Sequence, residues 1–113
     1  MSLKQALLQS HEYAKGIVRA GDTVVDATMG NGNDTAFLAE LAGSTGKVYA
    51  FDIQQEAVEK TREKLEQQGL VNRCVLIRDG HENMKQYICE PVRLVLFNLG
   101  YRPGGNHSLC TRG

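Results

Sequence analysis

The segment from Val24 to Thr35, VVDATMGNGNDT, constrains the fold of this chain more than any other. An apolar run ends in an acid, Asp26, and two glycines, Gly30 and Gly32, come shortly after it. A buried strand that stops at a glycine turn lets a ligand approach the backbone closely, because glycine has no Cβ. The polar residues 33–35 are of types that cap helices, so we expect a helix to begin at the same turn.

Hydrophobic periodicity divides the chain into alternating elements. We expect strands over residues 23–27, 47–52, 73–78 and 93–98, and helices over residues 2–20, 34–42 and 54–68. A short helix before the last strand is expected to turn Met84, Tyr87 and Ile88 inward. Strands that alternate with helices indicate parallel βαβ units, and therefore an α/β fold.

Three of the predicted strands end in an acid: Asp26, Asp52 and Asp79. The carboxyl ends of parallel strands share one edge of the sheet, so these acids should face one crevice. Asp52 is placed to accept two hydrogen bonds from ribose hydroxyls, with Ile53 and Gln54 beside it. Asp79 is placed to accept from the exocyclic amine of adenine. The pattern predicts a site for a nucleoside cofactor.

The residues around the turn favour S-adenosylmethionine over NAD. A dinucleotide-binding turn has a third glycine where this chain has Thr35. A pyrophosphate would also lie unfavourably close to the carboxylates of Asp26 and Asp34. S-adenosylmethionine has no phosphate, and its sulfonium and ammonium groups are attracted to acids. The remaining alternative is a parallel-sheet protein whose glycine turns bind nothing.

Length, charge and composition limit the other possibilities. The chain has 113 residues, enough for one domain, and its formal net charge is zero, so no broad field attracts nucleic acid. Its first residues are too polar for a signal peptide, and it has no long apolar run, which predicts a cytoplasmic protein without a membrane span. The three cysteines and three histidines are scattered, so we expect no metal site.

The segments SHEYAKGIVRAGDTVVDATMGNGNDT and FNLGYRPGG resemble the bacterial family of putative rRNA methylases. Members of that family are class I S-adenosylmethionine-dependent methyltransferases, and the better-understood ones methylate the aminomethyl group of the wobble uridine in transfer RNA. The resemblance covers nearly the whole chain. It implies a Rossmann-like α/β fold with parallel strands in the order 3-2-1-4, and an RNA substrate, most simply transfer RNA.

The resemblance also implies roles for residues. Gly30, Asn31 and Gly32 would bind the methionine part of the cofactor, and Gly80 and His81 would join Asp79 on the adenine side. Together with the reasoning above, the predicted cofactor contacts are Asp26, Gly30, Asn31, Gly32, Asp34, Thr35, Asp52, Ile53, Gln54, Asp79, Gly80, His81 and Asn98. The predicted substrate contacts are Ser10, His11, Leu99, Gly100, Tyr101 and Gly104.

Asn98 and Tyr101 are the predicted catalytic residues, because Asn98 ends the fourth predicted strand and Tyr101 lies in the loop after it, at the reactive end of the cofactor. The side-chain oxygen of Asn98 and the carbonyl of Leu99 would accept hydrogen bonds from the N–H groups of the substrate amine, and Tyr101 would stack on the uracil. None of these groups is a strong base, so removal of the amine proton is left to water or to another group.

Relatives of this fold continue for several more strands and helices. We therefore expect a single S-adenosylmethionine-binding domain, residues 1–113, that is incomplete at its carboxyl end. The fourth strand, with LVLF, would then be an unpaired apolar edge through which copies of the chain associate, for example as a homodimer. The alternatives are a small-molecule methyltransferase and a catalytically inactive fragment that binds the cofactor.

Overall fold

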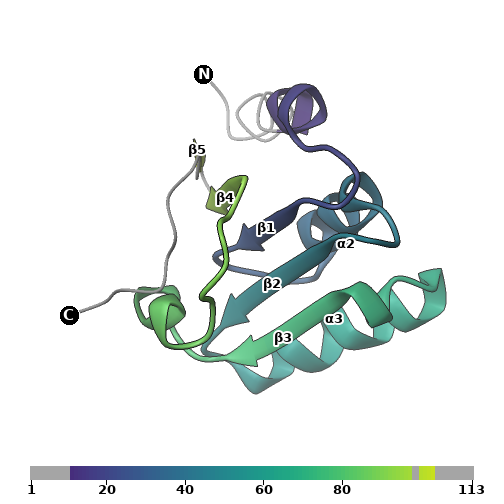
Figure 1. The fold of residues 1–113 in the computed structure, drawn as a ribbon. Helices are drawn as coiled ribbons and strands as arrows, with labels where there is room; N and C mark the ends of the chain where they lie inside the picture. Colours follow the sequence, from purple (N-terminus) through teal and green to yellow (C-terminus); the bar gives the residue numbers. More distant parts are fainter. Residues whose placement is uncertain (1–10, 98–99, 104–113) are drawn as a thin grey trace.

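The computed structural model describes residues 11–97 and 100–103 (Figure 1). Residues 11–17 are helical, and the elements after them are β1 (Thr23–Asp26), α2 (Asn33–Ala42), β2 (Lys47–Asp52), α3 (Gln55–Gln68), η1 (Val71–Arg73), β3 (Cys74–Arg78), η2 (His81–Gln86), β4 (Leu94–Phe97) and β5 (Gly100–Pro103). η1 and η2 are 3₁₀ helices. None of the described helices is long and apolar enough to cross a bilayer.

The described strands form a single sheet in the order β3-β2-β1-β4-β5. β1 pairs in parallel with β2 and with β4, and β2 pairs in parallel with β3. The predicted Rossmann-like arrangement, with four parallel strands in the order 3-2-1-4 and flanking helices, is therefore confirmed.

Both faces of the central strands are covered, which explains why the residues between the polar ends of β1 and β2 are all apolar. Val48 of β2 belongs to the core on the side of α2 and of the helix at residues 11–17, whereas Phe51 belongs to the core on the side of η2. The α3 helix runs alongside β3 (Figure 1). Its Val58 shares a core cluster with Ala50, which lies on the same face of β2 as Val48, so α3 covers the first of these sides. Because the two faces are covered, a site can form only at the edges of the sheet where the strands begin or end.

The structure corrects the expected edge of the sheet. β5 pairs antiparallel with β4, so that Phe97 lies opposite Gly100 and Leu94 lies opposite Pro103. Antiparallel strands need only a short connection, so a glycine-rich segment directly after a strand can return along it. The prediction of an unpaired β4 edge is therefore wrong, and the argument for self-association through that edge falls with it.

Two helix predictions were also inaccurate. The first helix ends at residue 17 rather than at 20, and the part predicted before residue 11 lies outside the described residues. In η2 and just after it, Met84 and Ile88 are buried as expected, but Tyr87 is 43% exposed. Tyr87 lies just past the end of η2, and its hydroxyl donates to the carboxylate of Asp79, so its ring stays at the surface.

Candidate functional site

The candidate site lies at the carboxyl edge of the sheet, where the direction of winding reverses. From β1 the chain crosses through α2 to β2 and then to β3, and it returns to β4 on the opposite side of β1. Ligands of open α/β sheets bind in the crevice at this kind of reversal. Asp26 and Asp52 end β1 and β2, and Asp79 comes directly after the last residue of β3, as predicted.

Two hollows at this edge meet at Asp52. The first, of about 300 Å³, is lined by Ala27, Thr28, Asp52, Ile53, Asp79, Gly80, His81 and Glu82. The second, of about 170 Å³, is lined by Gly30, Asn31, Asp52, Gln54, Glu56, Ala57 and Lys60. Eight of the predicted cofactor contacts are thus brought together around these two hollows.

The carboxylate of Asp52 is held by backbone groups on both sides. Its Oδ2 accepts from the backbone N–H of Gly30 at 3.1 Å, and its Oδ1 accepts from that of Gln54 at 3.0 Å. A carboxylate has about four acceptor positions, so one on each oxygen is left for a ligand. The two oxygens of one carboxylate can accept from two hydroxyl groups on neighbouring carbons.

The two glycines of the turn are required by its geometry. Gly30 and Gly32 both have positive φ, 56° and 88°. A Cβ at Gly32 would lie 3.0 Å from the backbone Cα of Thr61, so α3 approaches the turn too closely for a side chain there. At Gly30 a Cβ would meet nothing within 4 Å, and the backbone is open to a ligand. The turn is therefore braced by α3 on one side and accessible on the other.

Asp79 is oriented by side chains from η2 and just beyond it. Its Oδ1 accepts from Asn83 Nδ2 at 2.8 Å and from the N–H of Gly80 at 2.7 Å, and its Oδ2 accepts from the hydroxyl of Tyr87 at 2.6 Å. These three bonds, Tyr87 first, hold the pKa of Asp79 below its ordinary value, so the group is ionised at neutral pH. One acceptor position on Oδ2 remains free.

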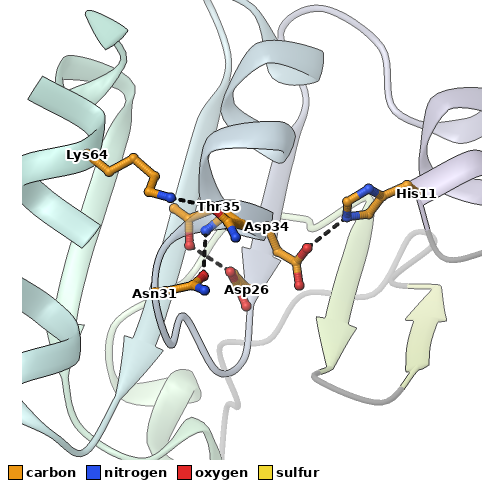
Figure 2. Close-up of polar contacts among 7 residues, drawn as sticks. His11, Asp26, Asn31, Asp34, Thr35 and Lys64 are labelled. Carbon is orange, nitrogen blue, oxygen red and sulfur yellow. Dashed lines mark hydrogen bonds and ion pairs between the residues drawn. The ribbon is translucent and has the colours of Figure 1, made fainter. Parts of the chain in front are cut away.

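Asp26 has a different environment, although it ends the neighbouring strand. Its side chain is 1% exposed and lines neither hollow. The hydroxyl of Thr35 donates to Oδ2 at 2.6 Å (Figure 2), and the N–H of Thr28 donates to Oδ1 at 3.2 Å. Burial raises the pKa of Asp26 to about 7 against the opposing effect of the Thr35 bond, and the nearby carboxylate of Asp34 raises it further. Asp26 and Thr35 join β1 to α2 beneath the turn.

Asp34, in the first turn of α2, is paired with His11. The Nε2 atom of His11 lies 2.7 Å from Oδ1 of Asp34 (Figure 2), and the imidazole stacks on the ring of Phe37 with 4.0 Å between centroids. Figure 2 also shows that the Asp34 carboxylate lies between Asp26 and His11. The sequence placed Asp34 and His11 in one site but gave no sign of this contact.

The remaining predicted site residues are only partly covered by the structure. Ser10, Asn98, Leu99 and Gly104 lie outside the described residues, and Gly100 and Tyr101 belong to the backbone of β5. Thr28, Glu82 and Lys60 line the hollows without having been predicted. Thr28 lies two residues past the end of a strand, which was a usable signal, whereas nothing in the sequence marks Glu82 or Lys60.

Comparison with known proteins identifies consistent relatives. A family model described as "Putative rRNA methylase" matches residues 48–113. The chloroplastic tRNA (mnm(5)s(2)U34)-methyltransferase of Arabidopsis thaliana is 42% identical over 96% of this chain and 43% of its own length. The chain therefore spans less than half the length of this curated relative.

Solved structures agree with this comparison. A putative rRNA methylase from Clostridium thermocellum superposes with a TM-score of 0.81 and 56% identity, over 81% of this chain and 51% of that one. A putative methyltransferase from Streptococcus mutans, solved in complex with SAH, gives a TM-score of 0.76 and 44% identity, over 95% of this chain and 57% of that one.

Proposed function

Because the chain belongs to the putative rRNA methylase family, we propose that it binds S-adenosylmethionine and forms part of an enzyme that methylates RNA. Within this class we propose the aminomethyl group of the wobble uridine in transfer RNA as the acceptor. The Arabidopsis thaliana relative, which carries this specificity in its name, supports that choice through its 42% identity over 96% of the chain. A small-molecule acceptor is the competing candidate, since the chain has no net charge.

The observation that carries the proposal is the state of the Asp52 carboxylate. Two backbone N–H groups fix it in place and leave one acceptor position on each oxygen for a ligand. This arrangement fits the two ribose hydroxyls of an adenosyl group. The first hollow extends from Asp52 to Asp79, whose free acceptor position on Oδ2 fits the exocyclic amine of adenine.

The charges of the site favour this cofactor over one with phosphates. Asp34 and Asp52 flank the glycine turn, and the N–H groups of Gly32 and Asn33 are already bonded to Met29 and Asn31. A phosphate would find negative charge and few free donors there. S-adenosylmethionine is cationic at its reactive end, and it supplies an electrophilic methyl group when bound. The chain itself provides orientation, with Asp52 for the ribose and Asp79 for the base.

The cofactor assignment is tested by Asp52→Ala. The substitution removes two hydrogen bonds to a charged acceptor, each worth about 1.5–3 kcal/mol, so S-adenosylhomocysteine should bind at least ~10-fold more weakly. Isothermal titration calorimetry measures the change. Glu63→Ala is the matched control, because it removes an acid that is exposed on α3 and lines neither hollow. Equal affinity of Asp52→Ala and wild type would refute the assignment.

The acceptor is tested with a chain extended to the length of its relatives. Labelled methyl groups should transfer to RNA that carries aminomethyl uridine at the wobble position. They should not transfer to the same RNA that is already methylated there. Labelling of small amines with equal efficiency would favour the small-molecule alternative instead.

A further inference from the structure

The His11–Asp34 pair lies at the carboxyl edge of the sheet, beside the reversal point. The helix at residues 11–17 ends near the edge of the sheet where β1 begins, and it starts near the opposite edge. Its first residue, His11, is therefore near the carboxyl end of β1. Asp34 reaches the same place from the first turn of α2, which begins directly after the glycine turn. The pair therefore lies beside the glycine turn of the proposed cofactor site, and neither residue lines the two hollows that meet at Asp52.

Two contacts fix the imidazole of His11. The hydrogen bond to Asp34 engages Nε2, and stacking on Phe37, with 16° between the ring planes, sets the orientation of the ring. Within the described part of the chain, Nδ1 has no hydrogen-bond partner. The side chains of His11 and Asp34 are 30% and 22% exposed, so a substrate can reach them. When Nε2 donates its proton to Asp34, Nδ1 presents a lone pair.

The proposed reaction needs such a group. An alkyl amine is protonated near neutral pH, as the ordinary pKa of lysine, about 10.4, illustrates. A protonated nitrogen has no lone pair with which to accept a methyl group. The carboxylates of Asp52 and Asp79 are engaged at the nucleoside end of the site. The amide of an asparagine and the phenol of a tyrosine are poor proton acceptors at pH 7. Imidazole is the side chain best suited to take a proton there.

We propose that His11, oriented by Asp34, accepts the proton that the ammonium group of the acceptor must lose before methylation. This inference rests on the proposed function, because it requires an amine as acceptor. One N–H bond of the ammonium group breaks, its electron pair stays on nitrogen, and the proton bonds to Nδ1 of His11. The imidazolium is stabilised by the Asp34 carboxylate, as in other aspartate–histidine pairs, and it returns the proton to solvent.

The other charged groups around His11 do not replace it. Glu12 and Lys15 lie on the same helix, pair with each other at 3.5 Å and are exposed. On the side of α2, Asp34 has Asp26 as an acidic neighbour, and Asp26 is buried and bonded to Thr35. Asp34 is thus the charged group in direct contact with the imidazole in the described structure.

The first test is the pH dependence of single-turnover methylation in the chain extended to family length. His11→Gln should lower the rate about 100-fold at pH 7, which is within the usual contribution of a general base. The deficit should shrink to less than ~5-fold near pH 10, where the free amine is already abundant. Glu12→Gln, on the same helix, should stay within about twofold of wild type across this range. A deficit of constant size at every pH would indicate a purely structural role and overturn the inference.

The second test does not depend on turnover. The ¹⁵N shifts of the His11 imidazole are measured at pH 7 in the complex with S-adenosylhomocysteine and an anticodon stem-loop. RNA with aminomethyl uridine should shift His11 toward the imidazolium, whereas RNA with hydroxymethyl uridine, which has no ammonium proton to give, should not. Equal shifts with both RNAs would contradict the proton transfer and leave the proposed function intact. Failure of wild type to methylate or to bind the RNA with aminomethyl uridine would overturn both the proton transfer and the proposed function.

Discussion

Asp26 and Asp79 occupy equivalent positions in the sequence pattern, each at the carboxyl end of a parallel strand, but their environments are opposite. Asp26 is 1% exposed, and burial raises its pKa to about 7. Asp79 faces a hollow, and hydrogen bonds from Tyr87, Asn83 and the Gly80 backbone lower its pKa. Each carboxylate accepts a hydroxyl hydrogen bond of 2.6 Å, from Thr35 in one case and from Tyr87 in the other.

The difference arises from the segment that succeeds each strand. After β1 the glycine turn returns the chain into α2, and Thr35 of that helix closes over Asp26. After β3 the chain enters η2, which stays at the rim, so that Asp79 is held from the side and remains open. The turn after a strand therefore decides whether the acid at the strand end is buried between two elements or lines a hollow, and the strand pattern itself does not reveal which.

The largest effect expected from this contrast is a pH dependence of stability due to Asp26. Its pKa is higher in the folded chain than the ordinary value of 3.8. The folded state therefore binds the proton more tightly, so this contribution is fully present below pH 4 and is lost as the pH rises to about 7. The loss is on the order of 4 kcal/mol, from about 1.4 kcal/mol per pKa unit.

Urea denaturation of wild type and Asp26→Asn between pH 5 and pH 8 measures the part of this loss that falls above pH 5, on the order of 3 kcal/mol. Asparagine does not titrate, so the difference in unfolding free energy between the two proteins should move in favour of the variant as the pH rises. Asp79→Asn is the control and should show no such trend in this window, since the pKa of Asp79 is already low. A difference between wild type and Asp26→Asn that stays constant with pH would show that Asp26 is not ionising in a buried site.

A smaller effect separates the two hydroxyl groups. Thr35→Val and Tyr87→Phe each remove one hydroxyl donor to an aspartate without changing the shape of the side chain much. Thr35→Val should cost about 1–3 kcal/mol of unfolding free energy at pH 8, because it leaves a buried carboxylate short of a partner. Tyr87→Phe should leave the denaturation midpoint unchanged, because water can replace the lost bond. Similar shifts in both variants would remove the distinction between the two acids.

The sequence predicted the parts of the molecule that depend on local pattern. Apolar runs ending in acids located β1, β2 and β3, and the order of the parallel strands came from the family resemblance. The sequence pattern also placed Asp52 and Asp79 at a common hollow, because the strand ends of a parallel sheet share an edge.

The features that the sequence missed depend on contacts between distant elements. His11 and Asp34 are 23 residues apart, and the close approach of Thr61 to Gly32 comes from another helix. Burial of Asp26 results from the way α2 packs on β1, which a strand pattern does not contain. β5 was missed because glycine and proline in Gly100–Pro103 favour a loop by propensity, whereas pairing with β4 decides the outcome.

The smallest effect concerns the binding role proposed for Asp79. Tyr87→Phe removes the first of the bonds that lower the pKa of Asp79, so this pKa should rise toward its ordinary value. At pH 7 the carboxylate stays ionised in both proteins, and affinity for S-adenosylhomocysteine should fall only about threefold, through looser orientation. As the pH falls toward 4, the carboxylate is protonated earlier in the variant, and the gap in affinity should widen.

Calorimetry at pH 7 and pH 4.5 measures both effects, and Asp79→Asn, which cannot titrate, should lose the pH dependence that Asp79 causes. An affinity ratio between wild type and Tyr87→Phe that is the same at both pH values would mean that Tyr87 does not control the charge of Asp79, and this acid would then owe its orientation to Asn83 and the Gly80 backbone alone.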